Sequence, residues 1–383
     1  MERTHIAFFG RRNAGKSSLV NRFTSQDLSI VSDVKGTTTD PVRKTMELLP
    51  LGPVVIIDTP GIDDEGDLGE LRVKRSSRII DETDIAILVV DLGEGIHKDE
   101  WDLIDIFEER KIPYIIAFNK SDIPVSSGFT LPQKAMLVSA LTGEGVEELK
   151  ERTAVIIKSR KSRPLVADLV ASGDLVVLVV PIDKSAPKDR LILPQQMVIR
   201  DLLEVGAIPV VTRDTELAVT LAKIPSPRLV ITDSQAFAKV SQIVPREVPL
   251  TSFSILMARF KGSLDQSLEG AYKLSELPEG AKVLISEGCT HHRQCEDIGT
   301  VKLPGWIKEF TGHEIEFDFT SGLEFPRDVT GYDLIIHCGA CMLGETEVAS
   351  RYRLAKEQGV PMTNYGIAIA MMKGILKRSV EML

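Results

Sequence analysis

The sequence predicts an α/β protein of three domains, and three observations support this prediction. The chain has 383 residues, more than one hydrophobic core usually supports, so two or three domains are expected. Short runs rich in valine and isoleucine alternate with polar, periodic segments, which indicates strand–helix–strand units around mainly parallel sheets. With 43% hydrophobic and 26% charged residues, the composition is typical of an ordered globular protein.

The three predicted domains follow from where this alternation pauses. The first, over residues 1–160, ends at a polar segment that closes with Pro164 and predicts a linker. The second is expected over 165–260 and the third over 261–383 as smaller α/β domains. No low-complexity tract or short repeat is visible. The predicted strands lie at 6–9, 54–57, 85–90, 114–118, 136–138, 175–180, 209–211, 229–232, 283–285, 315–319, 334–336 and 360–362, and a helix is expected over 195–205.

A phosphate-binding loop follows the first predicted strand. The loop reads Gly10-Arg-Arg-Asn-Ala-Gly15-Lys16-Ser17 and leads into a helix that starts near Ser18. Its glycines allow backbone N–H groups and the helix N-terminus to face phosphates. Lys16 would neutralise the β- and γ-phosphates, and the Ser17 hydroxyl would bind Mg²⁺, with Ser18 beside them in the nucleotide site.

The next motif, Asp58-Thr-Pro-Gly61, follows the strand at 54–57. The Asp58 carboxylate would hold Mg²⁺ through water, and the Gly61 amide would contact the γ-phosphate. Ile62 stands where Ras-like enzymes have a water-orienting glutamine, so slow intrinsic hydrolysis is expected. Thr38 is the expected switch threonine that closes on Mg²⁺, with Thr37 beside it. Lys16, Thr38 and Gly61 are therefore the predicted catalytic residues.

Two further motifs indicate that the base is guanine. Asn119-Lys120-Ser121-Asp122 follows the strand at 114–118. Asp122 can accept hydrogen bonds from guanine N1–H and its 2-amino group, whereas adenine offers neither donor. The Lys120 stem would pack along the base, and Ser139-Ala140 would give an amide to guanine O6. Four motifs in this order predict GTP and GDP binding.

Among GTPases, this domain resembles the group that contains the tRNA-modifying GTPase MnmE and the ribosome-assembly GTPase Era. Asn13 in the phosphate loop and the run Gly36-Thr37-Thr38 support the resemblance. In that group such an asparagine can help to bind K⁺ beside the phosphates, which implies stimulation by K⁺ over Na⁺. The alternative is a loop asparagine that bonds only its own backbone.

All four cysteines lie in the last quarter of the chain, and three form clusters with histidine. These clusters are Cys289-Thr-His291 and His337-Cys338-Gly-Ala-Cys341. Each follows a predicted strand, and neighbouring parallel strands would bring both to one sheet edge. Thiolates favour zinc, copper(I) or iron–sulfur clusters, and the spacing leaves a structural Cys3His zinc site and an iron–sulfur cluster both open. Buried inert thiols are a third reading, and Cys295 is expected to be a free thiol.

Cys-x-His followed by His-Cys-x-x-Cys, behind an MnmE-like GTPase, resembles the [FeFe]-hydrogenase maturation GTPases of the HydF family. Residues 179–183, 193–196 and 199–202 resemble that family's dimerisation domain. The resemblance implies a homodimer and a [4Fe–4S] cluster on Cys289, Cys338 and Cys341, with His291 or His337 near the fourth iron. It also implies a scaffold that receives a two-iron precursor from radical-SAM maturases and delivers it to apo-[FeFe]-hydrogenase.

Charge and composition also limit the partners and the alternative functions. The formal net charge of −9 disfavours nucleic acid as the main partner, because phosphates are neutralised by a basic face. No apolar run is long enough to span a membrane, and the cysteine spacing favours a reducing cytoplasm. The alternatives are a GTPase of tRNA modification or ribosome assembly, and a GTPase switch with structural zinc.

Overall fold

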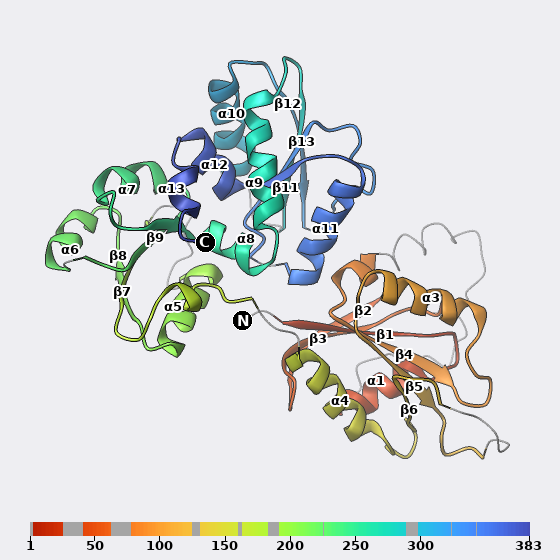
Figure 1. The fold of residues 1–383 in the computed structure, drawn as a ribbon. Coiled ribbons are helices and arrows are strands. Elements are labelled where there is room, and N and C mark those ends of the chain that lie inside the picture. Colours follow the sequence, from red (N-terminus) through yellow and green to blue (C-terminus); the bar gives the residue numbers. More distant parts are fainter. Residues whose placement is uncertain are drawn as a thin grey trace. The chain divides into compact units, whose positions relative to one another are not determined.

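The computed structural model describes residues 3–25, 41–62, 78–124, 131–159, 163–182, 191–224, 226–288, 298–322, 324–341 and 343–383. The chain divides into two compact units, residues 1–161 and 162–383 (Figure 1). The first unit contains one six-stranded sheet, and the second contains two four-stranded sheets. The predicted α/β class, with a phosphate-loop domain followed by smaller α/β domains, is confirmed.

The first unit has the strand order β2-β3-β1-β4-β5-β6. All neighbouring strands are parallel except β2 and β3, which pair antiparallel. Because β1, β3 and β5 run the same way, the segments that follow them emerge at one edge of the sheet. The strands are β1 (Thr4–Phe9), β2 (Val42–Leu48), β3 (Gly52–Asp58), β4 (Ile85–Asp91), β5 (Tyr114–Asn119) and β6 (Ala135–Leu137).

Helices cover both faces of this sheet. One face packs against α1 (Lys16–Thr24) and α4 (Val146–Ser159), where Leu19, Phe23 and Leu149 are fully buried. The other face packs against α3 (Lys98–Glu109) through residues such as Phe107. Since both faces are covered, the central strands are apolar throughout: β4 is buried at six consecutive residues, Ile85 to Val90.

The first sheet of the second unit has the order β10-β9-β7-β8, and all its pairs are parallel. Its strands are β7 (Leu175–Val179), β8 (Ile208–Thr212), β9 (Leu229–Thr232) and β10 (Leu250–Ser252). The helices that join or follow these strands are α5 (Leu193–Glu204), α6 (Leu217–Lys223), α7 (Phe237–Ile243) and α8 (Phe253–Phe260). We call this sheet the middle sheet.

The second sheet of this unit, called the C-terminal sheet, has the order β12-β11-β13-β14 and is also parallel. Its strands are β11 (Lys282–Glu287), β12 (Glu316–Ser321), β13 (Leu334–His337) and β14 (Met362–Asn364). The helices of this part are α9 (Leu264–Lys273), α10 (Leu303–Thr311), α11 (Glu345–Glu357), α12 (Tyr365–Met372) and α13 (Leu376–Val380).

The two small sheets have the same topology. From one edge of each sheet to the other, the strands are the second, first, third and fourth of that sheet in chain order. The last strand and helix also match in sequence: 248–262 and 360–374 are identical at seven of fifteen positions. Ser252 and Asn364, at matching positions, each cap the helix that follows by accepting an N–H three residues on. The likeness is between two whole α/β layers and not a short repeat, and it is clearest in this last strand and helix.

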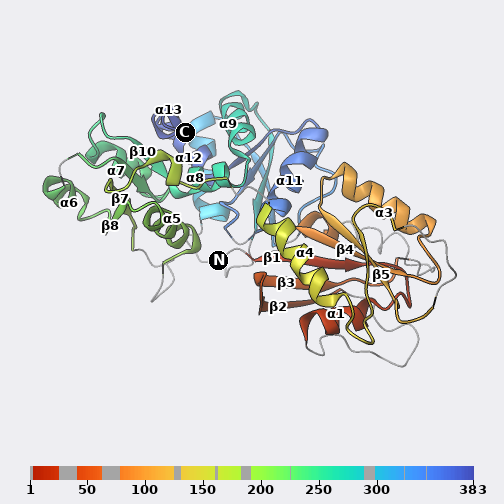
Figure 2. The same ribbon diagram turned by 60° about the horizontal axis from the view of Figure 1, so that its bottom comes forward.

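Each of the two sheets also packs against a helix that follows the other sheet in the chain. Helix α9, which follows the middle sheet, packs on β14, and α13, which follows the C-terminal sheet, packs on β10. The approach is close: a Cβ on Gly270 of α9 would lie 2.3 Å from the Met362 carbonyl oxygen. Helices α8, α12 and α13 lie together in both views (Figures 1 and 2). One apolar cluster accordingly joins Phe237 and Ile255 of the first copy to Ile367 and Leu376 of the second.

Within the described residues, no helix combines the length and apolar character needed to span a membrane.

Candidate functional site

The phosphate-binding loop joins β1 to α1, and its two outer glycines are required by the close packing of the backbone. Gly10 has φ 145° and Gly15 has φ 85°. A Cβ on Gly10 would lie 2.2 Å from the Val89 carbonyl oxygen, and one on Gly15 would lie 2.2 Å from Asn119 Nδ2. Any side chain at either position would collide with a neighbouring strand end, so the loop depends on glycine there.

Within this loop, Lys16 and Asn13 have defined conformations. The Lys16 ammonium donates to the Arg11 carbonyl oxygen at 2.9 Å, and the side chain is buried. Asn13 adopts the left-handed conformation, with φ 62°. Gly15 caps α1, whose first turn includes Ser17 and Ser18. The N-terminus of α1 and the Lys16 cation lie together, which suits an anion; the phosphate contacts themselves stay a prediction.

Ser17 and Asp58 meet where a magnesium ion is expected. The Ser17 hydroxyl donates to Asp58 Oδ2 at 2.7 Å. The second oxygen, Asp58 Oδ1, is buried without a hydrogen-bond partner among the described residues. Burial raises the pKa of the Asp58 carboxyl, although Ser17 and Lys16 act in the opposite direction. A half-buried hydroxyl and a carboxylate with an unused oxygen fit a Mg²⁺ ion, which prefers hard oxygen ligands.

The residues expected around guanine form one network of hydrogen bonds. Asn119 donates to the Ala14 carbonyl at 2.9 Å and accepts the Ala140 amide at 2.9 Å, so it links the phosphate loop to the loop after β6. The Ser139 hydroxyl donates to Asp122 Oδ1 at 2.5 Å and orients that carboxylate. Asn119 thus positions the two loops, and its contact with the nucleotide stays a prediction.

An open cavity of about 770 Å³ lies between α1 and the loop after β6. Two predicted nucleotide residues, Ser18 and Ala140, line it. Arg22 also lines it and donates to the Thr142 carbonyl at 2.7 Å. The remaining residues of its wall are Asn21, Ser25, Thr142, Gly143, Val146 and Glu147.

Two residues of this site were missed from sequence. Asp91, at the end of β4, pairs with the Lys120 ammonium at 2.5 Å and fixes the side chain expected along the base. Thr59 donates through its hydroxyl to the Phe8 carbonyl at 2.7 Å and ties the segment before Gly61 to β1. The position of Asp91 at the carboxyl end of a central strand was the available signal. Thr37 and Thr38 lie outside the described residues.

The second candidate site lies at the carboxyl edge of the C-terminal sheet. Strands β11 and β13 are parallel neighbours, and Ser286 pairs with His337. Cys338 Sγ accepts the Gly288 amide at 3.0 Å and the Ala340 amide at 3.4 Å. Gly288 directly precedes Cys289, so the backbone that leads into the first cysteine cluster touches the sulfur of the second. The expected pairing of the two parallel strands is therefore present up to Gly288, and the meeting of the two cysteine clusters stays a prediction.

Only part of the predicted ligand set can be described. Cys338 and Cys341 are both half-buried. Cys289 and His291, like His292 and Cys295, lie outside the described residues. The described part of the chain, this edge included, holds no group of three or more histidine, cysteine, aspartate or glutamate side chains placed to bind a metal. Backbone N–H groups aimed at a cysteine sulfur are nevertheless the surroundings that a thiolate ligand of a metal needs.

His337 is held by protein groups at both ring nitrogens. Arg351 Nη1 lies 2.9 Å from His337 Nε2, and because a guanidinium can only donate, Nε2 must accept. The ring proton is therefore on Nδ1, which donates to the Cys338 carbonyl oxygen at 2.9 Å. Arg351 is buried and also bonds Glu347 and the Gly322 carbonyl. In this conformation neither nitrogen of His337 has a lone pair directed at a metal, so binding iron would require the ring to leave Arg351.

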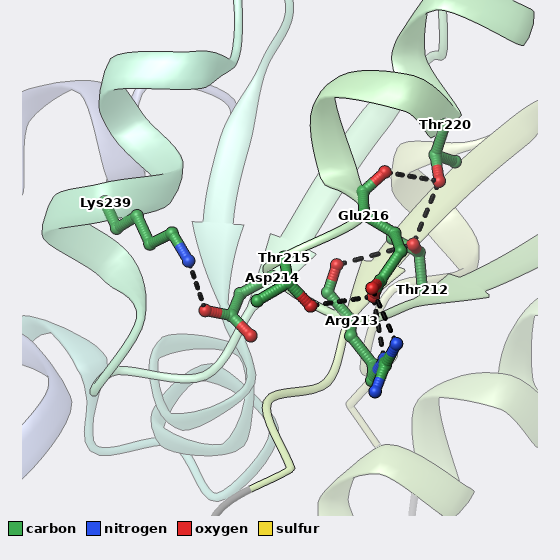
Figure 3. Close-up of polar contacts among 7 residues, drawn as sticks. All are labelled: Thr212, Arg213, Asp214, Thr215, Glu216, Thr220 and Lys239. Carbon is green, nitrogen blue, oxygen red and sulfur yellow. Dashed lines mark hydrogen bonds and ion pairs between the residues drawn. The ribbon is translucent and has the colours of Figure 1, made fainter.

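The corresponding edge of the middle sheet carries a different chemistry. Figure 3 shows polar contacts among charged and hydroxyl side chains around the carboxyl end of β8, on β8, the loop after it, α6 and α7. Arg213 donates twice to Glu216, at 2.6 and 2.7 Å, and Lys239 donates to Asp214 at 2.7 Å. These groups bond one another, and the described part of this edge has no cysteine or histidine. Of the two copies, the C-terminal sheet is the one that presents thiols.

Comparison with known families gives two related matches in the second unit. The profile of the hydrogen maturase F dimerization domain matches residues 165–262, and that of the hydrogen maturase F tetramerization domain matches residues 265–382. Together they cover more than half of the chain. The profile of a 50S ribosome-binding GTPase matches residues 5–120.

Curated relatives match the first unit. The tRNA modification GTPase MnmE of Aquifex aeolicus is 35% identical over 154 residues, which are 39% of this chain and 34% of that protein. MnmE of Streptococcus pneumoniae is 33% identical over 148 residues, 38% of this chain and 32% of that protein. The chain thus spans about a third of the length of these relatives. Era of Aquifex aeolicus, solved with GDP and aluminium fluoride, is 20% identical with a TM-score of 0.37, covering 56% of this chain and 93% of that one.

Proposed function

Because the chain belongs to the hydrogen maturase F family, we propose that it is a GTP-hydrolysing scaffold for maturation of [FeFe]-hydrogenase. Residues 5–120 form its GTPase domain. In this proposal, Cys289, Cys338 and Cys341 hold a [4Fe–4S] cluster, which supplies an iron corner that a further ligand can occupy. The protein receives a two-iron precursor from radical-SAM maturases and delivers it to apo-hydrogenase.

The contact between Gly288 and Cys338 is the observation that carries the cluster proposal. The 3.0 Å bond from the Gly288 amide to Cys338 Sγ brings the start of the first motif against the second. With Cys341 three residues further on, three thiols would meet at one sheet edge. Three thiolates leave one corner of a cubane without a cysteine, which suits a site that exchanges a ligand.

Anaerobic reconstitution with iron and sulfide, followed by metal analysis and EPR of the reduced protein, tests this proposal. The wild type should bind about four irons per chain and give a cluster signal. Cys338→Ala should abolish the signal, whereas Cys295→Ala, the matched control, should keep it. One tightly bound zinc and no cluster would support instead the GTPase switch with a structural Cys3His site.

For the nucleotide site, we propose GTP and GDP with Mg²⁺ held by Ser17 and Asp58, and activation by K⁺ through Asn13. Lys16, Thr38 and Gly61 would stabilise the γ-phosphate in the transition state. The expected observation is hydrolysis that is faster in KCl than in NaCl at equal ionic strength. Asn13→Ala should remove that difference, and equal rates in both salts would overturn the role of K⁺.

Assembly as a homodimer through residues 165–262 also belongs to this proposal. The family description of residues 265–382 as a tetramerization domain adds a second possible interface, which the sequence did not suggest. Light scattering at micromolar concentration separates a monomer, a dimer and a tetramer. A role in tRNA modification is less well supported, since the MnmE relatives match only the first unit.

A further inference from the structure

Lys261 is a buried cation beside the second cysteine motif. It follows α8, the last helix of the middle sheet, and its exposed fraction is 3%. Its ammonium donates to the Ala340 carbonyl oxygen at 2.7 Å and to the Leu343 carbonyl oxygen. Lys261, His337 and Cys338 line one small pocket. The cation thus reaches from the middle sheet to the cysteine-bearing edge of the C-terminal sheet.

The two carbonyls belong to the loop that contains Cys338 and Cys341. Ala340 lies between these cysteines and adopts a left-handed conformation, with φ 51°, that costs an alanine about 1–2 kcal/mol. Its carbonyl is part of the peptide bond to Cys341, so the bond from Lys261 fixes the orientation of that peptide. The same loop is fixed at its other end, where His337 Nδ1 donates to the Cys338 carbonyl.

The internal repeat provides a comparison for Lys261 within the same chain. Lys373 occupies the matching position after α12, in the shared sequence Lys-Gly. Lys373 is exposed, and its ammonium lies 5.6 Å from the centre of the Trp306 ring. Of the two matching lysines, the one next to the cysteines is therefore buried and bonded to their loop.

We propose that Lys261 is a positioning residue of the metal site, which holds the 338–341 loop in the shape that binds metal and places a positive charge beside the cluster. This inference rests on the proposed [4Fe–4S] cluster. A buried ammonium is costly unless its hydrogen bonds are satisfied, and the Ala340 and Leu343 carbonyl oxygens accept from Lys261. A cluster bound by three thiolates is an anion, so a cation held beside it would attract it.

Two consequences follow from this role. The positive charge should favour the reduced cluster, which carries one more negative charge, so its removal should lower the midpoint potential. The two hydrogen bonds should keep the loop ordered in the apo protein as well. The charge and the hydrogen bonds can therefore be tested separately.

The test compares Lys261→Met, Lys261→Gln and Lys373→Met in the full chain. Lys261→Met keeps the buried stem but removes both charge and donors, whereas Lys261→Gln is neutral and keeps a donor. Lys373→Met is the matched control. Redox titration followed by EPR gives the midpoint potential, iron loss to a chelator gives cluster retention, and hydrogen exchange of the apo protein reports the 338–344 backbone.

Both Lys261 variants should show a lower midpoint potential and lose iron about 10-fold faster, as typical for loss of a group that supports metal ligands. Hydrogen exchange over 338–344 should be fastest in Lys261→Met and slower in Lys261→Gln. Lys373→Met should match the wild type in all three measurements. If Lys261→Met has the same midpoint potential and the same hydrogen exchange over 338–344 as the wild type, the inference about Lys261 is wrong. The proposed function still holds in that case if the wild type binds the cluster. If the wild type binds zinc and no cluster, the proposed function is wrong. The predicted effect of Lys261 on the midpoint potential is then wrong as well.

Discussion

Arg351 connects three groups in the second unit, and its replacement gives a sharp quantitative test. It donates twice to Glu347 Oε1, at 2.7 and 2.9 Å, once to His337 Nε2 and once to the Gly322 carbonyl. The side chains of Arg351 and Glu347 are 3% and 11% exposed. Arg351→Met would leave a buried carboxylate without its cation, and two acceptors without a donor.

The expected loss is large because removal of one member of a buried ion pair costs about 3–5 kcal/mol. For a unit of this size, each kcal/mol lowers the melting temperature by about 2–4 °C, so a fall of about 10 °C is expected. Arg353 is the matched control on the same helix: it lies 3.9 Å from Glu357, and the two side chains are 40% and 64% exposed. Arg353→Met should cost less than about 1 kcal/mol.

Tryptophan fluorescence can measure this unit alone. Trp101 lies in the first unit and Trp306 in the second, so in a Trp101→Phe background the signal reports on Trp306. If the loss arises from the unpaired carboxylate, adding Glu347→Gln to Arg351→Met should recover part of it. Equal melting temperatures for Arg351→Met and Arg353→Met would refute the reasoning.

Three predictions concern the nucleotide site. Asp122→Asn should weaken GTP binding by at least about 100-fold and improve binding of xanthosine triphosphate. The reason is that the asparagine amide donates a hydrogen bond to the base where the aspartate carboxylate accepts one. Equilibrium titration with both nucleotides checks this. Burial raises the pKa of Asp58, and Mg²⁺ binds the carboxylate anion, so the apparent Mg²⁺ affinity of the wild type should fall as the pH is lowered. Asp58→Asn should bind Mg²⁺ weakly at every pH. A wild-type Mg²⁺ affinity that does not change with pH would contradict the prediction. Gly15→Ala should abolish nucleotide binding by displacing Asn119, whereas Gly95→Ala, where φ is 74° and nothing lies within 4 Å, should lose only stability in thermal unfolding.

The nucleotide site could be predicted from sequence because its motifs are short and each follows a strand. The glycine loop, Asp58 and Asp122 lie at one sheet edge for that reason. The role of Asn119 was less accessible, since its bonds run to Ala14 and Ala140, far along the chain. Its type and spacing indicate the nucleotide site but not which atoms it joins.

The groups that support the cysteine motif could not be predicted. Lys261 reaches a loop 79 residues away, and Arg351 reaches back 14 residues from a helix whose sequence has no motif. Such partners are defined by how elements pack, which a single sequence does not contain. The likeness of the two copies is hard to see in the sequence for another reason: the edge of one copy carries thiols and that of the other carries ion pairs, so the match is clearest in 248–262 and 360–374.

The exchange of α9 and α13 between the two small sheets has a mechanical consequence. Helix α9, which follows the middle sheet, packs on the C-terminal sheet, and α13, which follows the C-terminal sheet, packs on the middle sheet. A movement of one sheet relative to the other would therefore have to break these helix contacts. The two sheets and their described helices, from β7 to α13, should therefore move together. If nucleotide exchange moves this unit, the edge that carries the thiols should move together with both sheets. The conformational change would then have to lie outside the contacts between the two sheets.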